Sequence, residues 1–133
     1  MRIVLDSSVL IAAHITRAGV CAELLEDVLM EHQLFTSQFI LDEVARKLLE
    51  KFAFPESAAQ SIINFITHVA AKVEPATVPD NACRDPGDIP ILGTALAAEA
   101  NLLITVDRDL LAIGKYSDIA IIKPGAFWRL ASI

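Results

Sequence analysis

The sequence predicts an α/β fold, a three-layer α/β/α sandwich with a mostly parallel central sheet of about five strands. Short apolar runs that fit strands alternate with longer segments whose apolar residues recur at helical spacing. Strands that alternate with helices form βα units, which build a parallel sheet covered by helices on both faces. A length of 133 residues, with no internal repeat or linker, fits one domain over residues 1–133.

The first half of the chain alternates predicted strands with predicted helices. Strands are expected at residues 2–5 and around 34–36. Helices are expected to begin at Ser7, to span residues 21–32, to follow Ser37 and to run from Pro55 to near Lys72. Serine is a favourable helix cap, and proline suits the first turn of a helix. The apolar residues after Ser37 recur every three or four positions, which is typical of a helix packed on a core.

The second half begins with a polar segment, VEPATVPDNACRDPGD, whose three prolines and one glycine predict a strand fragment running into a loop. IPILGTALAAEA is apolar nearly all round, as expected of a helix buried on several sides. A strand at residues 102–106, a short helix at about 107–113 and a turn at Gly114 follow. The last elements are a strand at residues 118–122 and a helix that starts at Pro124 and carries Phe127 and Trp128.

Composition narrows the class of protein. A formal net charge of −6 argues against nucleic-acid binding by general electrostatic attraction, which needs an excess of basic residues. Charged residues interrupt every apolar stretch well before the ~18 residues of a membrane span, so no membrane association is expected. Cys21 and Cys83 have no CxxC spacing, which speaks against a zinc site or a disulfide framework and favours the cytoplasm.

Acidic residues stand where predicted strands and helices meet. Asp6 and Asp107 each follow a strand directly, and Asp109 comes two residues later. Helix capping is an alternative explanation for Asp6 and Asp107. Glu43 lies in the first two turns of the helix after Ser37, where a solvated face would also explain it.

Asp88 fits a capping role less well. Proline prefers the first helical position, so Pro90 predicts Ile89 as the cap and leaves Asp88 outside the helix. In a parallel sheet, ligands bind at the carboxyl ends of the strands, where these acids could converge. Such a cluster repels itself unless a hard divalent cation such as Mg²⁺ or Mn²⁺ neutralises it. The chemistry indicated is metal-assisted hydrolysis of a phosphodiester.

Three stretches carry a resemblance to a known family: IVLDSSVLIAA, SQFILDEVARKL and RDPGDIPILGTALAAEANLLITVDRDLL. Their acids, in this order, resemble those of the PIN domains, small metal-dependent nucleases that include the VapC-like ribonuclease toxins. The resemblance implies that the catalytic and metal-binding acids are Asp6, Glu43, Asp88 and Asp107, with Asp109 as a further metal ligand and Ser8 as an auxiliary hydroxyl.

The resemblance also implies an activity. A metal-activated water would hydrolyse phosphodiester bonds of single-stranded RNA, as in the toxin of a type II toxin–antitoxin pair. The implied partners are the RNA substrate, an antitoxin protein and further copies of the chain in a dimer or tetramer. Five basic residues are candidates for RNA binding, although charged residues usually face solvent and ordinary solvated charges also explain them: Arg46, Lys47, Lys51, Arg84 and Arg108.

Two other interpretations remain open. Ile89 stands where many relatives have a second aspartate, which together with the acidic charge would fit a catalytically inactive PIN-like binding module. Phosphoaspartyl chemistry of the haloacid dehalogenase kind would need an acid two residues after Asp6, where Ser8 stands.

Overall fold

The computed structural model describes residues 1–16 and 19–131. In the described part of the chain, six strands form one sheet in the order β3-β2-β1-β4-β6-β5. All neighbouring strands are parallel except β5 and β6. The strands are β1 (Arg2–Leu5), β2 (Gln33–Thr36), β3 (Ala71–Lys72), β4 (Leu102–Ile104), β5 (Lys115–Tyr116) and β6 (Ile119–Ile122). The predicted mostly parallel sheet is confirmed, with six strands in place of about five.

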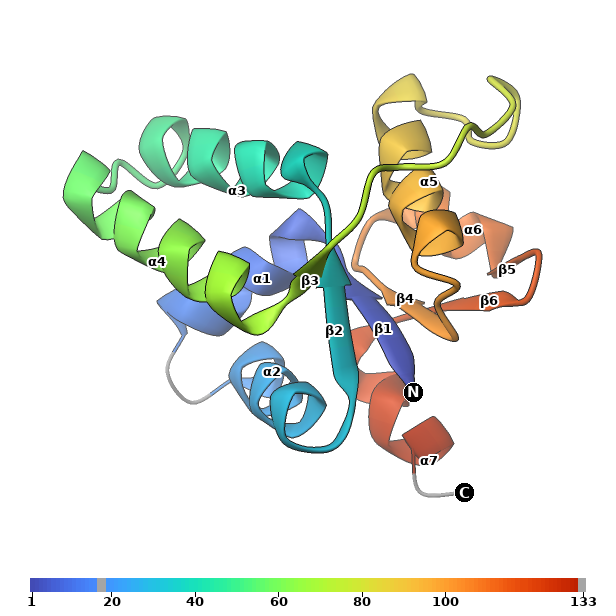
Figure 1. Ribbon diagram of the computed structural model, residues 1–133, viewed down its shortest axis with the longest axis horizontal. Helices are drawn as coiled ribbons and strands as arrows, with labels where there is room; N and C mark the ends of the chain where they lie inside the picture. Colours follow the sequence, from blue (N-terminus) through green and yellow to red (C-terminus); the bar gives the residue numbers. More distant parts are fainter. Residues whose placement is uncertain (17–18, 132–133) are drawn as a thin grey trace.

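Helices cover both faces of this sheet, which confirms the predicted three layers. Figure 1 shows α1 to α4 gathered on one side of the strands and α5 and α6 on the other. The helices are α1 (Ser7–Ile15), α2 (Val20–Glu31), α3 (Gln38–Glu50), α4 (Glu56–Val69), α5 (Ile89–Ala97), α6 (Arg108–Ile113) and α7 (Phe127–Ala131), with 3₁₀ turns η1 (Pro86–Asp88) and η2 (Pro124–Ala126). Over the described residues, no single helix is long and apolar enough to cross a membrane, and only α1 and α2 taken together, across a bend of 106°, meet those criteria.

Several element boundaries differ from the sequence prediction. The strand fragment expected within residues 73–88 lies earlier, as β3 at Ala71–Lys72. The helix expected to reach Lys72 ends at Val69, because the next residues pair with β2 as β3, with Ala71 opposite Phe35. The strand expected to reach residue 106 ends at Ile104, and the Thr105 side chain then accepts a hydrogen bond from a backbone N–H two residues on. The residue at the N-cap of α5 is Asp88, not Ile89.

The strand order reverses between β1 and β4. From β1 the chain moves outward to β2 and β3, and it then returns to the other side of β1 to form β4 and β6. The two strands stay joined at their carboxyl ends, where the Asp6 N–H donates to the Ile104 carbonyl at 3.0 Å. Ligands of parallel α/β sheets bind at this kind of reversal. The topology therefore makes the carboxyl ends of β1 and β4 the place to look for a site.

One glycine fixes α5 beside the loop that precedes it. The Ala76 N–H donates to the Gly93 carbonyl at 2.9 Å. A Cβ atom on Gly93 would lie 2.5 Å from the Ala76 carbonyl oxygen, so only glycine permits this approach. The contact holds the loop against α5, whose N-cap is Asp88.

Candidate metal centre

Asp6 lies directly after β1 and is 3% exposed. Its Oδ1 accepts from the Ser7 backbone N–H at 2.6 Å, and its Oδ2 accepts from the Thr105 hydroxyl at 2.7 Å. Burial raises the pKa of Asp6, these two hydrogen bonds oppose that effect, and the nearby Glu43 charge adds to it. A carboxylate oxygen has more than one lone pair, so both oxygens can still bind a cation while the hydrogen bonds fix their positions.

Asp107 caps α6, and in this respect the capping explanation is correct. Its Oδ1 accepts from the backbone N–H groups of Asp109 at 2.8 Å and Leu110 at 3.1 Å. Its own N–H donates to the Thr105 hydroxyl at 3.0 Å. Thr105 therefore joins the Asp6 carboxylate to the backbone of Asp107. The sequence analysis missed this residue, because a threonine in an apolar run is typical of an ordinary strand position.

Asp88 is the acid of this group whose charge is least offset by hydrogen bonds. It is 6% exposed, forms no side-chain cap on α5, and its buried Oδ2 has no hydrogen-bond partner among the described residues. Burial raises its pKa to about 7, and the charges of Asp107, Asp85 and Asp6 contribute to the same shift. A buried polar atom without a partner is costly and uncommon, and a bound cation is one way to satisfy it.

Glu43 reaches the same region from α3. The Ser7 hydroxyl donates to Glu43 Oε1 and accepts from Lys47 Nζ at 3.2 Å. Lys47 Nζ also forms an ion pair with Glu43 Oε1 at 3.6 Å, and the Glu43 side chain is only 17% exposed. The solvated-face explanation for Glu43 is therefore wrong. Ser7, and not the predicted Ser8, makes the hydroxyl contact with the site acids, because it is the first residue of α1.

Asp109 lies in a cluster that includes an acid the sequence analysis did not single out. Carboxylate oxygens of Asp85, Asp88 and Asp109 lie within 4.8 Å of one another. Asp85 was missed because it precedes a proline in a polar loop and follows no strand. The spacing Asp85-Pro86-Gly87-Asp88, with one acid at each end of a tight turn, was the available signal.

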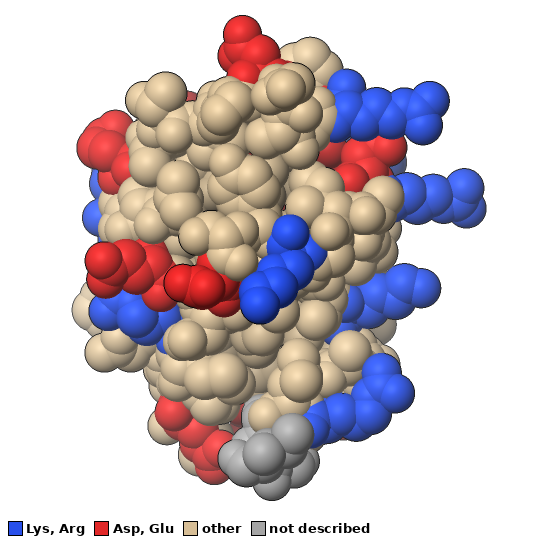
Figure 2. All heavy atoms as spheres, turned by 90° about the vertical axis from the view of Figure 1, so that its right-hand side faces the viewer, with Lys and Arg blue, Asp and Glu red and all other residues tan. Residues whose placement is uncertain are grey.

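The five basic residues predicted to bind RNA do not share one environment. Lys47 and Lys51 line a pocket of about 370 Å³ beside the acids, together with Ser8, Ile11, Ala12, Ile15, Thr16, Phe52 and Val106. Arg84 and Arg108 are exposed. Arg46 is exposed and pairs with Glu50 at 3.7 Å. Figure 2 shows several Lys and Arg side chains that project one above another along one edge of the face that it presents, separated by uncharged surface.

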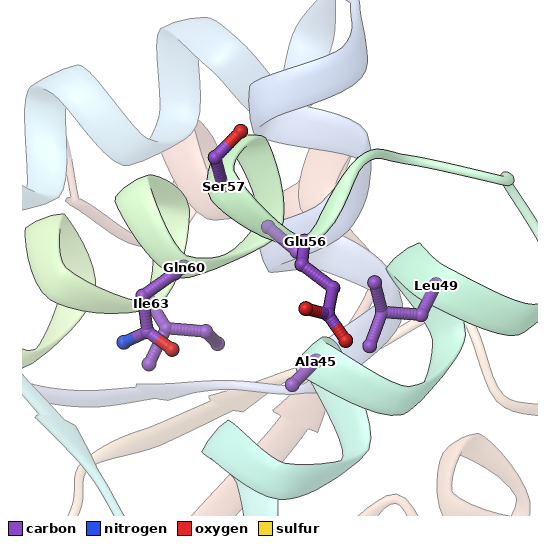
Figure 3. A pocket seen from close by; sticks show the side chains of 7 residues that line it. Ala45, Leu49, Glu56, Ser57, Gln60 and Ile63 are labelled. Atoms are coloured by element: carbon purple, nitrogen blue, oxygen red, sulfur yellow. The ribbon is translucent and has the colours of Figure 1, made fainter.

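A larger pocket of about 520 Å³ lies between α3 and α4, away from the acids. Figure 3 shows its wall of Leu49, Ala45 and Ile63, with the Glu56 side chain extending across it toward Leu49. None of the predicted site residues lines this pocket. Its single carboxylate offers no set of metal ligands.

The donor set of the acidic centre fits a hard divalent cation. Asp6, Asp88, Asp107 and Glu43 provide only oxygen ligands, which Mg²⁺ and Mn²⁺ prefer. The thiol of Cys83 feels the charges of the neighbouring aspartates, which together with burial raise its pKa to about 11. A thiol that stays protonated is a poor metal ligand.

Comparisons with known proteins agree with this geometry. The family model described as PIN domain matches residues 2–109. VapBC2 from Rickettsia felis, solved bound to a DNA fragment from its promoter, superposes with a TM-score of 0.65 at 13% identity, covering 92% of this chain and 98% of the other. VapBC-1 from nontypeable Haemophilus influenzae gives a TM-score of 0.63 at 16% identity, covering 94% and 99%.

The solved structures establish similarity of fold, and the family model establishes membership. No curated protein sequence matches the chain at a significant level. The resemblance found in the three sequence stretches is confirmed, since the model match includes all of the acids from Asp6 to Asp109. The chain belongs to the PIN domain family.

Proposed function

We propose that the chain is a Mg²⁺- or Mn²⁺-dependent endoribonuclease that hydrolyses single-stranded RNA. The observation that supports the proposal is the buried Asp88 carboxyl, which feels the charges of Asp107, Asp85 and Asp6 and has an oxygen without a hydrogen-bond partner among the described residues. Repulsion among these carboxylates needs a compensating cation. Membership of the PIN domain family supports the same conclusion.

In this proposal Asp6, Asp88 and Asp107 hold the cation, and Glu43 binds it or accepts a proton from water. When bound, the ion lowers the pKa of a water molecule and neutralises charge that develops on a phosphoryl group. Thr105 and Ser7 are positioning residues. Thr105 fixes Asp6 against Asp107, and Ser7 donates its backbone N–H to Asp6 and its hydroxyl to Glu43.

The pocket beside the acids supplies the contacts expected for RNA. Lys47 and Lys51 offer ammonium groups for phosphates, and the Phe52 ring, 42% exposed, offers a surface on which a base can stack. A local pair of lysines reconciles RNA binding with the net charge of −6, because no extended basic surface is required.

The proposal includes two protein partners. An antitoxin would mask the acidic centre until it is released, and the chain would form a dimer or tetramer. The similarity of fold to the chains of two VapBC structures supports the first, since those structures come from paired proteins. Co-expression with the neighbouring reading frame, followed by light scattering of the purified species, tests both.

Cleavage of a fluorescent single-stranded RNA tests the activity. We expect cleavage with Mn²⁺, none with a chelator, and at least a 100-fold loss in Asp6→Asn, with Asp118→Asn as the matched control on the exposed turn between β5 and β6. Cleavage that persists with chelator and in Asp6→Asn would contradict a metal-dependent mechanism. Absence of both cleavage and Mn²⁺ binding would favour the inactive binding module.

A further inference from the structure

The turn before α5 holds Asp85 in a defined position. The Gly87 backbone N–H donates to Asp85 Oδ1 at 2.9 Å, which caps η1, and Pro86 fixes the backbone of the first position in that turn. Asp85 is exposed, but this bond prevents its carboxylate from sampling the usual range of surface rotamers. The second oxygen remains available to a ligand from solvent.

The carboxylate of Asp85 lies close to two other carboxylates. Oxygens of Asp85, Asp88 and Asp109 lie within 4.8 Å of one another, a spacing that one cation can bridge. In the described part of the chain, the ion pairs are Arg46–Glu50 and Lys47–Glu43, so none of the three acids is paired with a basic side chain. We call Asp85, Asp88 and Asp109 the outer cluster.

A second, independent observation points to a ligand. Asp88 is 6% exposed, and its Oδ2 has no hydrogen-bond donor. Asp6 and Asp107, by contrast, each accept hydrogen bonds from backbone or hydroxyl donors. A carboxylate without donors gains most from a cation, because nothing else offsets its charge.

We infer that Asp85 is a metal ligand that binds, with Asp88 and Asp109, a divalent cation in the outer cluster. Oxygen donors from three carboxylates, with one member open to solvent, suit Mg²⁺ or Mn²⁺ with waters in the remaining positions. The inference rests on the proposed function insofar as Asp88 also serves the centre of Asp6 and Asp107. It adds a ligand from the turn Asp85-Pro86-Gly87-Asp88, which supplies acids from both of its ends.

Calorimetric titration with Mn²⁺ tests the assignment on the whole chain. Asp85→Asn retains an oxygen that can accept from the Gly87 N–H, so the turn is preserved while the charge is lost. We expect the affinity for Mn²⁺ to fall by about 10- to 100-fold or more, the scale on which even indirect contacts affect metal sites. Asp80→Asn, in the same exposed loop, is the matched control and should bind like the wild type.

A second variant and a second measurement distinguish the loss of a metal ligand from misfolding of the variant. Asp85→Ser also keeps a capping oxygen, and circular dichroism checks that both variants are folded. At a Mn²⁺ concentration near the wild-type dissociation constant, the amide NMR signals of Gly87 and Asp109 should broaden in the wild type, and the same broadening should need a concentration about 10- to 100-fold higher in the variants. Unchanged affinity and broadening in folded Asp85→Asn and Asp85→Ser would overturn the inference alone. A wild type that binds no Mn²⁺ would overturn it together with the proposed function.

Discussion

Removing the charge of Asp88 should stabilise the protein when no metal is present. Asp88 is 6% exposed, lacks a partner at Oδ2, and faces the charges of Asp107, Asp85 and Asp6. Its pKa is raised from 3.8 to about 7, so ionisation is less favourable in the folded chain than in the unfolded one. Asp88→Asn keeps the shape of the side chain and removes the ionisation.

The size of the effect follows from this pKa. One pH unit corresponds to about 1.4 kcal/mol, so the interval from 3.8 to about 7 sets an upper limit of about 4 kcal/mol. Asp85 is open to solvent, and screening by water reduces the repulsion. We therefore expect Asp88→Asn to raise the free energy of unfolding at pH 8 by about 1–3 kcal/mol in chelator.

The metal-free stability of the wild type should depend on pH through Asp88. Between pH 4 and 7 the folded wild type keeps a proton on Asp88 that the unfolded chain releases, so metal-free stability falls as pH rises and levels off above 7. The advantage of Asp88→Asn should accordingly shrink as the pH falls through 7 and vanish near 4. With saturating Mn²⁺ the order reverses, because the cation stabilises the wild type.

Urea unfolding followed by circular dichroism, at pH 4.5, 6 and 8 with chelator or Mn²⁺, measures these differences. Asp118→Asn on the exposed turn between β5 and β6 is the control and should change stability by less than about 0.5 kcal/mol. A metal-free Asp88→Asn that is less stable than the wild type at pH 8 would refute the reasoning, because Asp88 would then be satisfied in the folded protein.

Three further predictions use other parts of the structure. Thr105→Val removes the hydroxyl that joins the Asp6 carboxylate to the backbone of Asp107, and it should lower Mn²⁺ affinity about 10-fold in calorimetry. Unchanged affinity would exclude a positioning role for Thr105. Gly93→Ala places a Cβ 2.5 Å from the Ala76 carbonyl oxygen and should cost about 1–3 kcal/mol in urea unfolding, so a neutral result would contradict the close packing. Glu43→Gln should reduce RNA cleavage at least 10-fold with little effect on folding, whereas its exposed neighbour on α3, Glu50→Gln, should cleave normally.

The fold was largely predictable because its central strands are short apolar runs. β1, β4 and β6 are buried or half-buried along their length, as is β2 after its exposed first residue, Gln33, and burial is what apolar patterning reports. The strands β3 and β5 contain two residues each and lie at the edges of the sheet. Their pairing depends on the neighbouring strand, which no local pattern in the sequence specifies.

The site was predictable to the extent that its acids follow strands. Asp6 and Asp107 are placed by β1 and β4, and the rule for parallel sheets brings them together. Thr105 and Ser7 could not be recognised, because their hydroxyl contacts depend on strand register and on the position of α3. The role inferred for Asp85 could not be recognised, because it depends on the folded chain bringing Asp85 and Asp88 close to Asp109, which is a tertiary property.

Crystals of the protein soaked in Mn²⁺ and measured at the manganese absorption edge give the most direct test. The predicted result is anomalous density bonded to Asp88 together with Asp6 or Asp107, at the carboxyl ends of β1 and β4. Carboxylates that remain free of Mn²⁺ at saturating concentration would contradict the assignment of this cluster as a metal centre.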